Sequence, residues 1–126
     1  MSKISINIRS RKSSTEEEIP IVEIGGSLDA HTAAQLEETF KIFLNNHQYK
    51  IIIDFSLLEY ISSGGVGLFM SIIDEVREHS GDILLVNLRP GVLRVFQILG
   101  LHKIFQILYN EEDAVAKLVS SPKEVK

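Results

Sequence analysis

Two adjacent hydroxyl side chains, Ser62 and Ser63, stand directly before a cluster of glycines in the middle of the chain. The preceding run 51–55 is apolar and of strand length, whereas the following run 68–76 is apolar and of helix length. A serine at such a strand-to-helix junction faces solvent beside backbone N–H groups that lack helical partners. Because these N–H groups and the helix dipole favour negative charge, the junction is well suited to carry a phosphate group.

Other chemistries fit this junction less well. A serine at a helix start is usually a plain N-cap that contributes roughly 1 kcal/mol, and this role is compatible with phosphorylation of Ser63. A P-loop requires Gly-Lys-Ser/Thr, but the chain has no lysine between Lys50 and Lys103. A hydrolase nucleophile elbow requires glycine two residues before the serine, and Ile61 occupies that position. We therefore expect neither a P-loop nor a serine hydrolase at this junction.

Composition restricts the class of protein further. The 126 residues suffice for one domain, and the net charge of −4 argues against a nucleic-acid partner. The chain has no cysteine, which excludes thiolate metal sites and suits a reducing cytoplasm, and its four histidines lack metal-ligand spacing. Residues 1–5 contain no long apolar core, so we expect no signal peptide, and no apolar run approaches the roughly 20 residues that span a bilayer. We expect a cytoplasmic protein that binds neither metal nor membrane.

Hydrophobic periodicity predicts an opening hairpin followed by alternating helices and strands. The predicted strands are 4–8, 19–24, 51–55, 83–86 and 104–108, the predicted helices are about 30–44, 68–79, 90–99 and 111–119, and the segments 9–18 and 25–29 are predicted to be a loop and a turn. This order indicates an α/β sandwich with a mixed sheet of four to five strands and about four helices mainly on one face. We expect a single domain over residues 1–126, with its core at about 4–119 and a frayed tail at 120–126.

Three local motifs resemble the STAS family, the anti-sigma factor antagonist domains of bacterial partner-switching systems. Residues 26–29 (Gly-Ser-Leu-Asp) resemble the family's Gly-x-Leu-Asp turn after the second strand. Residues 53–56, followed by Tyr-Ile at 60–61, resemble its central strand and the approach to its switch. Residues 62–67 (Ser-Ser-Gly-Gly-Val-Gly) resemble the switch loop itself. The resemblance extends over about residues 4–119 and implies a STAS-like sandwich. It also implies a binding protein with no catalytic residue, no cofactor and no enzyme activity.

The resemblance places the family's phosphorylated serine on Ser63, because Gly65 then matches the motif's glycine and Val66 its leucine. Ser62 stands where an aspartate often precedes that serine, and an alignment shifted by one residue would place the phosphate on Ser62. Two partners are implied: an anti-sigma factor that is also a serine protein kinase, or a similar switch kinase, and a metal-dependent serine phosphatase. The unphosphorylated domain is expected to bind the kinase and release the client that the kinase holds.

Residues around the two serines complete the predicted site. The predicted partner-binding residues are Asp29, Ser62, Ser63, Gly64, Gly65 and Val66. Asp29 is equally well explained as a helix cap. Asp54 and Gly67 are expected to shape the loop: Asp54 by accepting hydrogen bonds from the N–H groups of the turn and holding Ser63 in place, and Gly67 by permitting tight packing.

Two alternative functions stay open on the sequence. The first alternative, within the same family, is a STAS subunit that regulates a transporter or another non-sigma effector, and such domains can lack a used phosphorylation site. A protein of a different class, a small nucleotide- or ligand-binding protein, would use the Gly64–Gly67 loop at the helix N-terminus.

Overall fold

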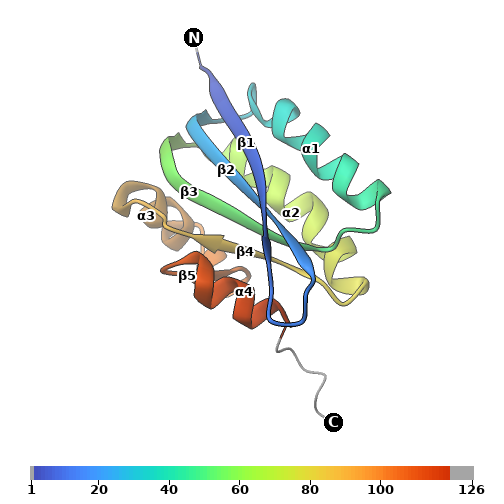
Figure 1. Ribbon diagram of the computed structural model, residues 1–126. Coiled ribbons are helices and arrows are strands. Elements are labelled where there is room, and N and C mark those ends of the chain that lie inside the picture. Colours follow the sequence, from blue (N-terminus) through green and yellow to red (C-terminus); the bar gives the residue numbers. More distant parts are fainter. Residues whose placement is uncertain (1, 120–126) are drawn as a thin grey trace.

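The structure, a computed structural model that describes residues 2–119, contains a five-stranded sheet flanked by helices (Figure 1). In chain order the elements are β1 (Ile4–Lys12), β2 (Glu18–Leu28), α1 (Ala33–Asn45), β3 (Lys50–Ile61), α2 (Ser63–Glu78), β4 (Asp82–Val86), α3 (Pro90–Ile98), the 3-10 helix η1 (Leu101–Lys103), β5 (Gln106–Leu108) and α4 (Glu111–Val119). The strands follow one another in sequence order across the sheet, with β1 antiparallel to β2 and all other neighbours parallel. The predicted α/β sandwich with a mixed sheet is confirmed. The predicted tail at 120–126 lies outside the described residues.

The sheet is apolar on both faces, and each face is covered by different helices. On one face, α1, α2 and α3 contribute Phe40, Phe69 and Phe96 to the larger core cluster. On the other face, α4 packs Val115 and Leu118 against β3 and β4 in a smaller cluster. Because successive residues of a strand point to opposite faces, residues of β3 alternate between the two clusters. Three helices therefore share one face, as predicted, and α4 alone lies on the opposite one.

The opening hairpin is longer than predicted. β1 pairs with β2 in antiparallel register from Ile4 through Lys12, so the predicted loop 9–18 shrinks to residues 13–17. The polar residues of this segment belong to a strand because Arg9 and Arg11 bind carboxylates on the α4 side of the sheet.

The predicted turn at 25–29 is also largely strand. β2 continues to Leu28, and β3 continues to Ile61, because the two extensions pair with each other in parallel register. Two register shifts interrupt this pairing near Gly25 and Gly26. Gly26 has a φ of +82° and lies against the carbonyl oxygen of Lys3, so it serves a strand irregularity rather than a turn.

The C-terminal half follows the prediction closely. Pro90 occupies the first turn of α3, and the Asn110 carboxamide oxygen accepts a hydrogen bond of 2.8 Å from the backbone N–H of Asp113 at the start of α4. β5 is shorter than predicted, because the chain first forms η1 and a turn at Ile104.

Candidate functional site

One residue, Ser62, separates the end of β3 from the start of α2 at Ser63. We call the N-terminal end of α2, residues 62–64, the helix mouth. Ser62 has extended backbone angles, and its Oγ accepts a hydrogen bond of 3.3 Å from the backbone N–H of Gly65. Its carbonyl oxygen accepts bonds of 3.0 Å from the N–H groups of Gly65 and Val66. Ser62 is therefore the N-cap. The prediction that the bare Ser63 hydroxyl caps the helix is wrong, because the helix already begins at Ser63.

Ser63 is the first residue of α2 and is exposed to solvent. In the part of the chain that the structure describes, the backbone N–H groups of Ser63 and Gly64 donate to no protein acceptor. This is the expected condition of the first helical turn, and it leaves a positive helix end around an accessible hydroxyl. The arrangement can accept an anion on the Ser63 side chain without losing an existing contact.

The glycines behind Ser63 bring the helix into close contact with the β2–α1 connection. A Cβ atom on Gly64 would lie 2.9 Å from the Cβ atom of Ala30, and one on Gly65 would lie 2.4 Å from the carbonyl oxygen of Leu28. Gly65 and Val66 are buried. Of the predicted partner-binding residues, only Asp29, Ser62, Ser63 and Gly64 therefore reach the surface.

Asp29 lies beside the helix mouth because Leu28 and Ile61 are paired strand ends. Its carboxylate accepts hydrogen bonds of 2.9 Å from the backbone N–H groups of His31 and Thr32, which closes the turn before α1. Hydrogen bonds from the Ser2 hydroxyl and from the Thr32 backbone lower the pKa of Asp29. Asp29 is not the N-cap of α1, because the helix begins at Ala33 with Thr32 in the cap position.

The two predicted loop-shaping residues do not shape the mouth. Gly67 lies inside α2, and a Cβ atom there would meet nothing within 4 Å. Asp54 lies in the middle of β3, opposite Glu23 and Val86 in the neighbouring strands. Its side chain projects to the face that α4 covers, whereas α2 lies on the other face, so Asp54 cannot hold Ser63 in place.

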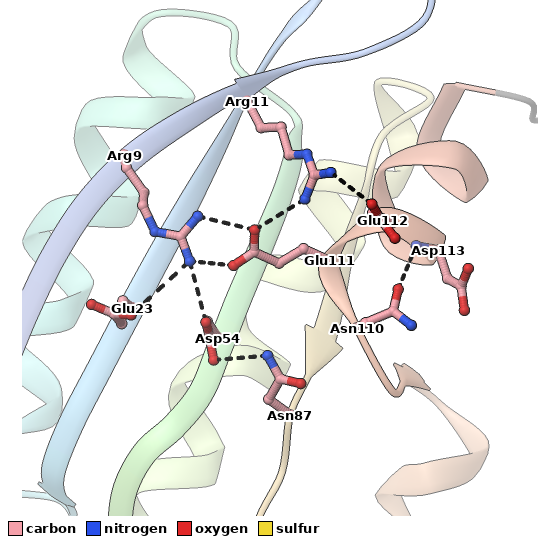
Figure 2. A network of polar contacts seen from close by, with 9 residues as sticks. All are labelled: Arg9, Arg11, Glu23, Asp54, Asn87, Asn110, Glu111, Glu112 and Asp113. Carbon is pink, nitrogen blue, oxygen red and sulfur yellow. Dashed lines mark hydrogen bonds and ion pairs between the residues drawn. The ribbon is translucent and has the colours of Figure 1, made fainter.

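Asp54 instead belongs to a polar network that joins the strands β1 and β3 to helix α4 (Figure 2). Asp54 is only 3% exposed, and its carboxylate accepts hydrogen bonds from the Ser56 backbone N–H at 2.9 Å and the Asn87 carboxamide at 3.3 Å. The Arg9 guanidinium lies 3.3 Å from its second oxygen. A buried carboxylate requires such partners, because an unpaired charge in a protein interior is strongly unfavourable.

Arg9 also forms a two-pronged ion pair with Glu111 in the first turn of α4, and Arg11 reinforces it at 3.4 Å (Figure 2). The hydrogen bond from Arg9 lowers the pKa of Glu111, and the same bond raises the pKa of Arg9. The carboxylate also lies at a helix N-terminus, where negative charge is favourable. Sequence reasoning missed this network because its members are 102 residues apart and Arg9 was predicted to lie in a loop.

With this geometry established, comparison with known proteins identifies the family. The sequence model of the STAS domain matches residues 11–114, and the chain belongs to the STAS domain family. The putative anti-sigma factor antagonist BtrV of Bordetella bronchiseptica is 30% identical over 91 residues, covering 72% of this chain and 78% of that protein. The anti-sigma-B factor antagonist of Listeria monocytogenes is 29% identical over 104 residues, covering 82% and 88%.

Solved structures show the same fold. The anti-sigma factor antagonist SpoIIAA in its unphosphorylated form superposes with a TM-score of 0.70 at 25% identity, covering 91% of this chain and 95% of that one. The phosphorylated form of SpoIIAA from Bacillus superposes with a TM-score of 0.65 at 24% identity, covering 90% and 98%.

Further observations concern membrane spanning, metal binding and nucleotide binding. Every helix within residues 2–119 is too short or too polar to cross a membrane, and no three potential metal ligands gather within the same range. The Gly64–Gly67 segment, on which a nucleotide-binding loop was predicted, is the first turn of α2.

Gly65 and Gly67 of α2 provide a matched test of the close contact at the start of this helix. Gly65→Ala should lower the free energy of unfolding by about 1–3 kcal/mol, because its Cβ atom must displace the Leu28 backbone. Gly67→Ala should instead raise it by up to about 1 kcal/mol, because alanine favours a helix and has space there. Urea unfolding measures both values, and equal effects of the two variants would contradict the predicted contact.

The pairing of Arg9 with Glu111 predicts a defined pH dependence of stability. Because the folded pKa of Glu111 is lowered, its contribution is fully present above the unfolded pKa of about 4.3 and is lost as the pH falls through the folded pKa. Glu111→Gln should lower the free energy of unfolding by about 1–2 kcal/mol at neutral pH, and this difference should shrink in acid.

Glu112→Gln is the control for this experiment, because the Glu112 side chain is 78% exposed and, within residues 2–119, its carboxylate pairs only with Arg11, at 3.4 Å. Unfolding is followed in urea at pH values from about 3 to about 7, because carboxylates titrate within this range. A Glu111→Gln difference that stays constant down to the lowest pH would rule out the ion pair as its source.

Proposed function

We propose that this protein is an anti-sigma factor antagonist that works as a phosphorylation-controlled partner switch. Family membership and the relatives named as anti-sigma factor antagonists support the class of function. The single observation that carries the switch is the position of Ser63, an exposed hydroxyl on the first residue of α2. The protein acts by binding, and its partner in the unphosphorylated state is an anti-sigma factor with serine kinase activity.

The switch operates through the charge and shape of the helix mouth. A phosphate group on Ser63 adds about −1.5 to −2 charges and three acceptor oxygens. The positive end of α2 tolerates this anion, so the helix and the fold stay intact. The contacts of Gly64 and Gly65 with the β2–α1 connection hold the surface around Ser63 in one shape. A partner fitted to a small neutral hydroxyl on that rigid surface is repelled sterically and electrostatically.

The two neighbouring serines differ in ways that favour Ser63. The Ser62 side chain is half-buried, and its Oγ already accepts a hydrogen bond from Gly65. The Ser63 side chain is exposed, and no hydrogen bond of its hydroxyl occurs within the described residues. Phosphorylation of Ser63 by the kinase releases the antagonist, and a metal-dependent serine phosphatase restores the binding form.

Phosphorylation of Ser63 is tested by incubating the full chain with its cognate kinase and ATP, followed by intact-mass measurement and peptide mapping. We expect one phosphate on the peptide that contains Ser63, no phosphate on the Ser63→Ala variant, and continued phosphorylation of the Ser62→Ala variant. A phosphate that moves with Ser62 would assign the switch to the other serine. Absence of any phosphate on the active, folded chain would remove the kinase from the proposal.

The effect of the added charge is tested by measuring kinase affinity of Ser63 variants. Ser63→Ala should bind like the wild type, whereas Ser63→Asp should bind about 5- to 150-fold more weakly, the range typical of such coupling. Ser14→Asp is the matched control, because it adds the same charge to an exposed serine in the β1–β2 turn. Equal affinities of the Ser63→Asp and Ser14→Asp variants would show that charge at the helix mouth does not control binding.

A further inference from the structure

A groove of about 860 Å³ opens at the carboxyl ends of β4 and β5. The residues that follow these strands, Leu88 and Tyr109, line it together with Leu93 of α3. Its volume falls within the roughly 300–1,000 Å³ of small-molecule sites. Ser62 and Ser63 do not line the groove, so it is separate from the helix mouth.

The wall of the groove is mainly apolar and only partly covered by the protein itself. Leu88, Leu93, Ile107 and Leu108 line it and are half-buried. Tyr109 at its rim is 92% exposed. Apolar side chains that stay partly in water favour a ligand with an apolar body, because covering them removes their surface from water.

The rim of the groove is positively charged, although the whole chain carries a net charge of −4. Arg89, His102 and Lys103 line the groove, and no aspartate or glutamate does so among the described residues. Within residues 2–119, none of these three side chains is paired with a carboxylate. The Arg89 Nε donates a hydrogen bond of 2.9 Å to the carbonyl oxygen of Ser56, which anchors the guanidinium at the rim.

We propose that this groove binds a small organic anion with an apolar body, of the class of medium-chain carboxylates. The carboxylate lies at Arg89 and Lys103, whose charges have no partner on the protein, and the hydrocarbon body covers Leu93 and Ile107. Both parts of the ligand are required: a cationic rim selects an anion, and an apolar wall selects a hydrocarbon.

The proposal is tested by titrating the full ¹⁵N-labelled chain with sodium octanoate and, separately, with octan-1-ol. The two probes have the same hydrocarbon chain and differ in charge. Octanoate should shift the amide signals of residues 87–93 and 102–109, and octanol should bind at least tenfold more weakly. Equal affinity for the two probes, absence of octanoate binding, or shifts centred on residues 62–66 would overturn the proposal.

A charge-reversal variant at the rim distinguishes recognition of the carboxylate from nonspecific hydrophobic binding. Lys103→Glu should weaken octanoate binding at least tenfold, whereas Lys117→Glu, an exposed residue of α4 outside the groove, should leave it unchanged. Arg89→Gln provides a second variant, and native amide signals away from the groove show that each variant is folded. Unchanged octanoate affinity in both rim variants would overturn the proposal. Ser63→Asp should not alter octanoate affinity, so the groove is testable independently of the switch.

Discussion

The arrangement of the site depends on residue 65 being glycine, which has no side chain. This absence lets the first turn of α2 approach the backbone at the end of β2 so closely that no Cβ atom would fit there. The carbonyl oxygen of Leu28, which occupies that space, also accepts a hydrogen bond of 3.0 Å from the Ser62 N–H. The end of β2 and the start of α2 are thereby joined through one peptide group. Ser62 is held in the cap position, and Ser63, the next residue, is left on the outside.

The two faces of the sheet are stabilised by different kinds of interaction. The face under α1, α2 and α3 holds the aromatic core and supports the helix mouth. The face under α4 combines a smaller apolar cluster with a buried carboxylate whose charge is balanced by Arg9. Arg9 also binds Glu111, so one guanidinium neutralises a charge inside the sheet and attaches a strand to a helix. Such a network stabilises only while all of its members are present, because each lost partner leaves a desolvated charge.

The sequence predicts the order of the elements and the neighbourhood of the site, but not its exact residues. Local glycine chemistry at Gly25 and Gly26 indicates a turn, but pairing with β1 on one side and with the end of β3 on the other keeps this segment in the sheet. Ser62 and Ser63 are locally equivalent, so the cap cannot be assigned before the end of β3 is known. Arg9 and Arg11 resemble loop residues because the carboxylates that they bind lie about a hundred residues later in the chain. The apolar run 51–55 predicts Asp54 at the end of its strand, but Asp54 lies in the middle because β3 continues to Ile61.

The contact between Arg9 and Glu111 joins the first strand to the last described helix. On the ribosome, the hairpin, the central strand and the serine junction are all made before α4 emerges. Until then, Ile52 and Leu84 lack the helix that covers them. Asp54 can already pair with Arg9 and Asn87, but Arg9 and Arg11 still lack the Glu111 carboxylate. The nascent chain therefore exposes apolar side chains and incompletely paired arginine charges on this face of the sheet. The face is covered only after α4 has been synthesised. Premature termination before α4 would yield a chain whose serine junction at 62–63 is complete but whose opposite sheet face stays exposed and prone to aggregation.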